Sequence, residues 1–215
     1  MKVNYKSYWR KSGLKGNWGN IFLRQLSEHK PKNFLEIGVF CGVTAKNVCK
    51  FLKEINGDNF KYIGIDLFGG EKISNNDEIE PKFLKNQKFS NPIKNLVYNY
   101  ILREKLNSLK SVENFLKEYK NNIQLIQGDS NMILKSLDLQ NIEFAFIDGG
   151  HSYKTVQNDL DILYKNLKGK KSVLLCDDYG KEGEITEVKN AIDDYVKIKN
   201  LKVEVIENRF AKIIV

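Results

Sequence analysis

The sequence predicts an α/β fold with a mostly parallel β-sheet, and three observations support this prediction. Short apolar runs alternate with segments of helical periodicity from residue 33 onward. Three of the runs end directly in an aspartate, at Asp66, Asp148 and Asp177. The last two runs, 203–206 and 211–215, lie so close together that they indicate an antiparallel hairpin at one sheet edge. Seven strands are expected in total.

The N-terminal half of the pattern begins with an expected helical cap over residues 1–31, in which 21–26 is apolar. A short strand at 33–37 breaks at a glycine and leads into a helix whose apolar residues share one face. A second strand follows at 61–67. Strand, helix and strand in this order indicate a parallel crossover.

Regular alternation stops between residues 69 and 122, where we expect an insertion that acts as a part-helical lid. Insertions longer than an ordinary strand-to-helix connection are usually functional. Helical patterns run through 96–109 and 112–119. Alternation then resumes, with strands expected at 123–126, 144–147 and 173–176 and helices at 132–137, 153–167 and 186–198.

Composition limits the function classes. The chain has 215 residues and is 41% hydrophobic, and no low-complexity linker divides it, so one domain spanning 1–215 is expected. Its net charge of +8 comes from scattered lysines without a basic and aromatic block, which makes nucleic acid an unlikely partner. No apolar run is long enough to span a membrane or to serve as a signal peptide, and the three cysteines lack metal-finger spacing. A cytoplasmic protein with buried, reduced thiols is the expectation, and a homo-oligomer is allowed.

A glycine turn follows the first strand, with the pattern acid-x-Gly-x-x-x-Gly at Glu36, Gly38 and Gly42. Glycines let the backbone turn sharply and approach a ligand. Asp66 ends the second strand, where an acid can bind both hydroxyls of a ribose. Because the Gly-x-Gly-x-x-Gly fingerprint is absent, a nicotinamide cofactor is disfavoured.

From about residue 33 to the C-terminus this arrangement resembles the class I methyltransferases, which have a Rossmann-like sheet and bind S-adenosylmethionine. The resemblance implies that Glu36, Gly38 and Gly42 face the methionine part of the cofactor and that Asp66 holds its ribose. It also implies that Asp129 and Ser130, after the third strand, reach the adenine. An Asp-Ser pair in that position is equally typical of a helix N-cap.

Acids gather at the ends of two later strands. Asp148 follows the run 144–147, and Asp177 and Asp178 follow the run 173–176. Ligands collect at the carboxyl ends of neighbouring strands in open α/β sheets, and carboxylates suit Mg²⁺ or Mn²⁺. His151 lies three residues after the first acid, where it can take a proton from a metal-held group or begin a helix.

These motifs resemble, more narrowly, the macrocin and mycinamicin sugar O-methyltransferases and the cephalosporin hydroxylase-like proteins. The resemblance implies Mg²⁺ ligands at Asp148, Asp177 and Asp178, with His151 as the base and Asp148 taking part in catalysis and cofactor binding. A divalent ion and a neutral imidazole together make a hydroxyl nucleophilic at pH 7. Asp159 and Asp161 are expected on a solvated helix face, Tyr179 lines the acceptor pocket or packs, and His29 is expected at the surface.

The expected function is therefore an S-adenosylmethionine-dependent, Mg²⁺-dependent O-methyltransferase. Its acceptor is a small, carbohydrate-like or diol-like molecule, because two adjacent oxygens can chelate the ion. Two alternatives stay open. One is a metal-independent methyltransferase acting on nitrogen or RNA, prompted by the positive charge, and the other is a non-catalytic binding protein with the same fold.

Overall fold

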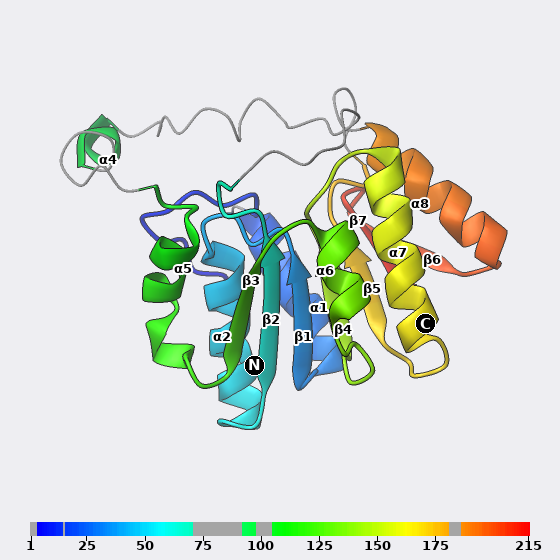
Figure 1. Cartoon of the computed structure of the whole chain (residues 1–215), viewed down its shortest axis with the longest axis horizontal. Helices are drawn as coiled ribbons and strands as arrows, with labels where there is room; N and C mark the ends of the chain where they lie inside the picture. The colour runs from blue at the N-terminus through cyan, green and yellow to red at the C-terminus, as the bar shows by residue number, and fades with distance from the viewer. Residues whose placement is uncertain (1–3, 15, 71–91, 98–104, 181–185) are drawn as a thin grey trace.

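A seven-stranded sheet forms the centre of the protein in the computed structural model, which describes residues 4–14, 16–70, 92–97, 105–180 and 186–215 (Figure 1). The strand order is β3-β2-β1-β4-β5-β7-β6. The first five strands pair in parallel, while β7 pairs antiparallel with both β5 and β6. The strands are β1 (Asn33–Ile37), β2 (Lys61–Asp66), β3 (Ile123–Gln127), β4 (Phe144–Ile147), β5 (Val173–Cys176), β6 (Val203–Ile206) and β7 (Phe210–Ile214).

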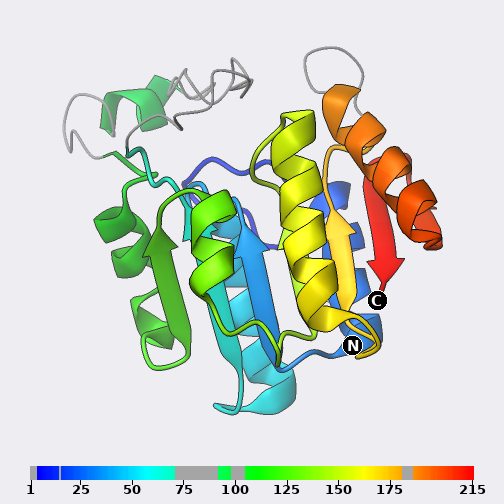
Figure 2. The same cartoon turned by 45° about the vertical axis from the view of Figure 1, so that its right-hand side comes forward.

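Helices cover both faces of this sheet (Figure 2). One face packs against α1 (Asn17–His29), α2 (Val43–Asn56) and α5 (Leu109–Phe115), through a core rich in phenylalanine. The other face packs against α6 (Ser130–Ser136), α7 (Tyr153–Leu167) and α8 (Thr186–Lys199), through mainly aliphatic side chains. These three layers and the C-terminal hairpin confirm the predicted fold class.

The order in which the chain adds strands to the sheet switches sides between β1 and β4. From β1 the chain adds β2 and β3 on one side, and then crosses to add β4 and β5 on the other. In parallel sheets such a switch point leaves a crevice at the carboxyl ends of the strands, where ligands bind. The two predicted halves of the site, after β1 and β2 and after β4 and β5, therefore meet at this crevice.

The insertion differs from the expectation in the part that the structure describes. A short helix, α4 (Pro92–Leu96), ends where a helix over 96–109 was expected to begin, and residues 105–108 form a turn. After it, α5 and a 3₁₀ turn at Lys117–Tyr119 pack in the aromatic core beside α2, with Val112 and Leu116 fully buried. Residues 109–119 are thus part of a core layer, and the expected lid over 71–91 and 98–104 falls outside the described residues.

All three cysteines are buried and unpaired by disulfides, as expected. Among the helices in the described ranges, none combines the length and the apolar character that crossing a membrane requires.

Candidate active site

The glycine turn after β1 lies against the loop after β4. Gly38 has φ +94°, and a Cβ there would lie 2.0 Å from the carbonyl oxygen of Asp148. Gly42 is the N-cap of α2 and has φ +77°, and a Cβ there would lie 3.0 Å from a methyl group of Val112. Both glycines are therefore required by the protein's own backbone and neighbours, whatever ligand the turn binds.

The Glu36 side chain, at the start of the glycine turn, is buried. It is 1% exposed, and its Oε2 accepts a hydrogen bond of 2.5 Å from the Tyr62 hydroxyl. Within the described ranges its Oε1 has no hydrogen-bond partner. Burial raises the pKa of Glu36 to about 8. A ligand that brings a hydrogen-bond donor or acceptor to this carboxyl would satisfy the second oxygen.

Asp66 ends β2 as predicted and is already engaged by the backbone. Its Oδ2 accepts from the backbone N–H of Phe40 at 2.7 Å, and its Oδ1 accepts from that of Phe68 at 2.6 Å. Burial raises the pKa of this carboxyl, and the two backbone hydrogen bonds oppose the rise. Since a carboxylate oxygen can accept more than one hydrogen bond, Asp66 keeps capacity for ribose hydroxyls while its orientation is fixed.

Asp129 and Ser130 follow β3 and lie at the start of a helix, which is the structural alternative that the sequence left open. Asp129 is the N-cap of α6 and accepts from the Asn131 backbone N–H at 2.9 Å. The Ser130 hydroxyl is buried and donates to Asp159 at 3.1 Å. The expectation for Asp159 was wrong, because this residue faces α6 and is only 1% exposed. Asp161 is half-exposed and pairs with Lys165 and Lys199, as expected for a solvated face.

The three predicted metal ligands come together at the ends of β4 and β5. Asp148, Asp177 and Asp178 each offer a carboxylate oxygen, and these oxygens lie within 4.8 Å of one another. Hydrogen bonds between adjacent strands continue into the loops, since the backbone N–H of Asp177 donates to Ile147 at 3.0 Å. Asp178 has φ +62°, an unusual conformation for a residue with a side chain. A convergent set of three oxygen donors fits Mg²⁺ or Mn²⁺.

A cation that the sequence reasoning missed already contacts this cluster. Arg209, in the turn between β6 and β7, donates from Nε to Oδ1 and from Nη2 to Oδ2 of Asp177, each at 2.6 Å. Burial alone would lower the pKa of Arg209, but its hydrogen bond to Asp177 raises it overall. Burial raises the pKa of Asp177, and Arg209 opposes that rise. The signal in the sequence was an arginine in a chain that uses lysine almost everywhere else.

His151 lies against the same acids. Its Nε2 is 3.2 Å from Oδ2 of Asp178, and the ring is 7% exposed. The next residue, Ser152, is the N-cap of α7 and accepts from the Thr155 backbone N–H. His151 therefore stands just outside the helix, with its Nε2 beside Asp178, and it is the candidate base of the site.

His29, the other histidine, is partly covered rather than fully at the surface as expected. Its ring centroid lies 6.0 Å from that of Phe144, in an edge arrangement.

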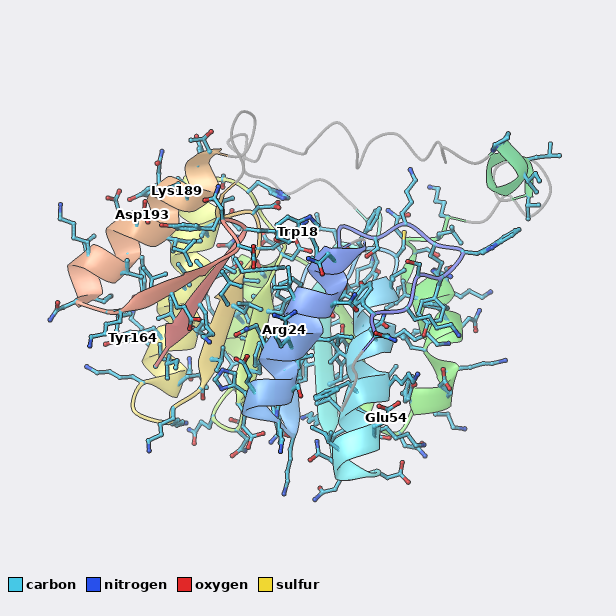
Figure 3. The ribbon with its side chains drawn as sticks, turned by 180° about the vertical axis from the view of Figure 1, so that it is seen from behind. Trp18, Arg24, Glu54, Tyr164, Lys189 and Asp193 are labelled. Carbon is cyan, nitrogen blue, oxygen red and sulfur yellow. The ribbon has the colours of Figure 1, made fainter. Side chains whose placement is uncertain are left out.

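The loops after β4 and β5 line a small pocket of about 10 Å³ that is partly open to solvent, which is about the room that one water molecule needs. Tyr179, which follows the acidic pair, does not line it. Its hydroxyl donates to Asp193 of α8 at 2.6 Å, and Lys189 pairs with the same carboxylate (Figure 3). The lining residues are Ile147, Asp148, Gly149, Gly150, His151, Val156, Cys176, Asp177, Asp178 and Val188.

The N-terminal segment borders both halves of the crevice, which the sequence did not indicate. The Tyr5 hydroxyl forms hydrogen bonds with Ser12 and with Thr44 in the first turn of α2. Gly13 lies so close to the acids that a Cβ there would be 3.7 Å from Oδ2 of Asp148. Arg10 donates to the carbonyl of Cys41 in the glycine turn at 2.7 Å.

Comparison with known proteins agrees with this architecture. The family model for a methyltransferase domain matches residues 35–179, which include the glycine turn, Asp66 and all three clustered aspartates. A search of curated proteins found no match.

Solved structures with the same fold include three methyltransferases. The O-methyltransferase NovP is 15% identical with a TM-score of 0.63, covering 91% of this chain and 79% of NovP. The TDP-rhamnose 3'-O-methyltransferase CalS11 of calicheamicin biosynthesis is 15% identical with a TM-score of 0.57, covering 94% of this chain and 81% of CalS11. The methyltransferase PaMTH1 of Podospora anserina, solved with S-adenosylhomocysteine, is 13% identical with a TM-score of 0.58, covering 91% of this chain and 76% of PaMTH1.

The family match covers more than half of the chain, and the sheet order, the glycine turn and the strand-end acid agree with it. The chain therefore belongs to the methyltransferase domain family and is an S-adenosylmethionine-dependent methyltransferase with the class I fold.

Proposed function

We propose that this enzyme is an O-methyltransferase that uses a divalent metal ion to methylate a hydroxyl of a sugar or another small diol-like molecule. The observation that carries the proposal is the convergence of Asp148, Asp177 and Asp178 beside His151. Among the structures with the same fold, CalS11 is described as a sugar O-methyltransferase and NovP as an O-methyltransferase, which supports an oxygen acceptor.

The proposal assigns the cofactor to the first two strands. The glycine turn from Glu36 to Gly42 would face the methionine part of S-adenosylmethionine, and Asp66 would hold the ribose. Asp129 and Ser130 would reach the adenine, from the capped start of α6. S-adenosylmethionine supplies an electrophilic methyl group on a sulfonium.

The proposal assigns the acceptor to the fourth and fifth strands. A divalent ion held by the three carboxylates would lower the pKa of an acceptor hydroxyl, which is the chemistry that such an ion supplies. His151, beside the cluster, would accept the proton of the acceptor hydroxyl. Asp178 holds the imidazole in place, and Asp148 links this half to the glycine turn through its contact with Gly38. The pocket excludes part of the solvent from these groups.

The experiment that tests the proposal is a methyl-transfer assay with S-adenosylmethionine labelled in the methyl group. The acceptor panel contains catechol, nucleotide sugars with vicinal hydroxyls, the corresponding deoxy sugars, and a short RNA. We expect label transfer to a compound with two adjacent hydroxyls, in the presence of Mg²⁺ or Mn²⁺, and loss of transfer in EDTA. Transfer to RNA, or transfer to any compound that persists in EDTA, would contradict the proposal.

A further inference from the structure

Arg209 lies in a turn that contacts the acidic loop after β5 at two points. Its guanidinium forms two parallel hydrogen bonds with the carboxylate of Asp177, whose side chain is 1% exposed. Its backbone carbonyl accepts from the N–H of Tyr179 at 2.9 Å. Asp178 stands between these two attachment points, so the turn fixes the backbone on both sides of this second acid.

The next residue of the loop, Gly180, lies tightly against the same turn. A Cβ at Gly180 would lie 1.5 Å from the carbonyl oxygen of Asn208, which no side chain can do without displacing the backbone. Asn208 itself has φ +51°. The loop and the turn therefore lie so close together that position 180 requires a glycine. This close contact fixes the position of Arg209 relative to Asp177.

The guanidinium is also held from the side of the N-terminal segment. Nη2 of Arg209 lies 3.4 Å from the carbonyl oxygen of Gly13, and the guanidinium carbon lies 5.1 Å from the Trp18 ring centroid. Figure 3 shows Trp18 at the end of α1 that lies near the carboxyl edge of the sheet. An arginine held by a carboxylate, a carbonyl and an aromatic ring has little freedom to leave the site.

We propose that Arg209 is a positioning residue that holds the Asp177 carboxylate in place and supplies its counter-charge within the acidic centre. The inference rests on the proposed function, because it concerns the metal centre assigned there.

The physical reason is the low exposure of the cluster. Asp177 and Asp178 are 2% and 3% exposed, so their mutual repulsion is poorly screened by water. Arg209 compensates part of this repulsion before any ion binds, and it orients Asp177 by the two-pronged contact. The same positive charge repels an incoming dication. Arg209 therefore stabilises the metal-free protein and lowers its affinity for the metal ion.

The test compares Arg209→Met with Arg209→Lys and the wild type, with Arg24→Met on the exposed face of α1 as the matched control. Melting temperatures are measured in EDTA and in saturating MnCl₂, and the Mn²⁺ dissociation constant is measured by electron paramagnetic resonance. In EDTA we expect Arg209→Met to melt roughly 5–10 °C lower, because a buried charge loses its partner. Arg209→Lys should recover part of the loss, and Arg24→Met should match the wild type.

With Mn²⁺, Arg209→Met should recover at least about half of its lost melting temperature and bind the ion at least about tenfold more tightly than the wild type, since the neighbouring positive charge is gone. Unchanged melting in EDTA, or weaker Mn²⁺ binding by Arg209→Met, would overturn the inference.

A double variant separates this inference from the proposed function. If the wild type binds no Mn²⁺, the metal part of the proposed function fails. The counter-charge role is then judged in EDTA alone, by adding Asp177→Asn to Arg209→Met. Removal of the uncompensated carboxylate should restore part of the melting temperature, and a double variant that melts no higher than Arg209→Met would overturn the role of Arg209.

Discussion

The two halves of the crevice hold their acids by different means. After β2, Asp66 is fixed by backbone N–H groups of Phe40 and Phe68, which cannot dissociate from it without unfolding the turn. After β4 and β5, two of the acids have charged or titratable side-chain partners, with Arg209 on Asp177 and His151 on Asp178. Backbone donors give a rigid site, while a charged side-chain partner gives a site whose charge balance an ion can change.

This difference matches the two tasks that we propose. A cofactor ribose needs a fixed pair of acceptors, and a metal centre needs donors whose repulsion the ion relieves. The following predictions test whether the two halves are as separate as the geometry indicates, beginning with the largest expected effect.

Asp178→Asn should abolish most metal-dependent turnover. Asparagine tolerates the left-handed backbone at position 178, so the fold should be retained while the charge is lost. We expect kcat to fall about 10³-fold, with an unchanged dissociation constant for S-adenosylhomocysteine. Asp161→Asn on the half-exposed face of α7 is the matched control and should keep wild-type turnover. If both variants lost the same turnover, the loss would come from replacing an aspartate by asparagine in general and not from the acidic cluster.

His151→Gln should lower kcat by about 10²-fold to 10³-fold, because no other imidazole lies in the pocket to take the proton. Mn²⁺ affinity and cofactor affinity should stay within about twofold of the wild type. These three quantities are measured by labelled methyl transfer, electron paramagnetic resonance and calorimetry. A large loss of Mn²⁺ affinity would show that His151 acts as a ligand and would remove it from the role of base.

Asp66→Asn tests the other half. We expect the dissociation constant for S-adenosylhomocysteine, measured by calorimetry, to rise about tenfold to 100-fold, since hydrogen bonds to a charged acceptor are lost. Mn²⁺ binding should not change. Asp58→Asn, at an exposed position paired with Lys53, provides the control. A loss of Mn²⁺ binding in Asp66→Asn would show that the halves are coupled through the Gly38 contact.

Glu36 should make stability depend on pH. Its pKa is about 8 in the folded protein against an ordinary value of 4.5, so the folded state binds the proton more tightly than the unfolded state. Stability therefore falls as pH rises from about 4.5 to about 8, by up to about 1.4 kcal/mol per pH unit in the middle of that range. Glu36→Gln should flatten this slope in urea unfolding measured at pH 5.5, 6.5 and 7.5. The same slope in both proteins would assign the dependence to another group.

Much of this site was predictable from the sequence. The runs before Asp66, Asp148 and Asp177 indicated strand ends, and parallel strands bring such ends to one edge. The hairpin at the C-terminus followed from two strand patterns with a short gap. Local patterns of this kind are fixed by backbone geometry, which is why they can be inferred from residues close in the chain.

The contacts that the sequence did not predict join residues far apart in the chain. Arg209 reaches Asp177 from 32 positions away, and the Arg10 donor reaches Cys41 from 31 positions away. The burial of Asp159 depends on Ser130 of another helix. The helix α5 was assigned to a lid because its apolar face gave no indication of its partner, which is α2. Pairings of this kind depend on the tertiary arrangement, and a periodic pattern carries no information about the partner.

The central claim is that the acidic cluster is a divalent metal centre. The most direct measurement is a titration of Mn²⁺, followed by electron paramagnetic resonance, into the protein saturated with S-adenosylhomocysteine, comparing wild type, Asp148→Asn and Asp161→Asn. We predict one bound ion per chain in the wild type and in Asp161→Asn, and a dissociation constant at least about tenfold weaker in Asp148→Asn. No bound ion in the wild type, or equal affinity in all three proteins, would contradict the account.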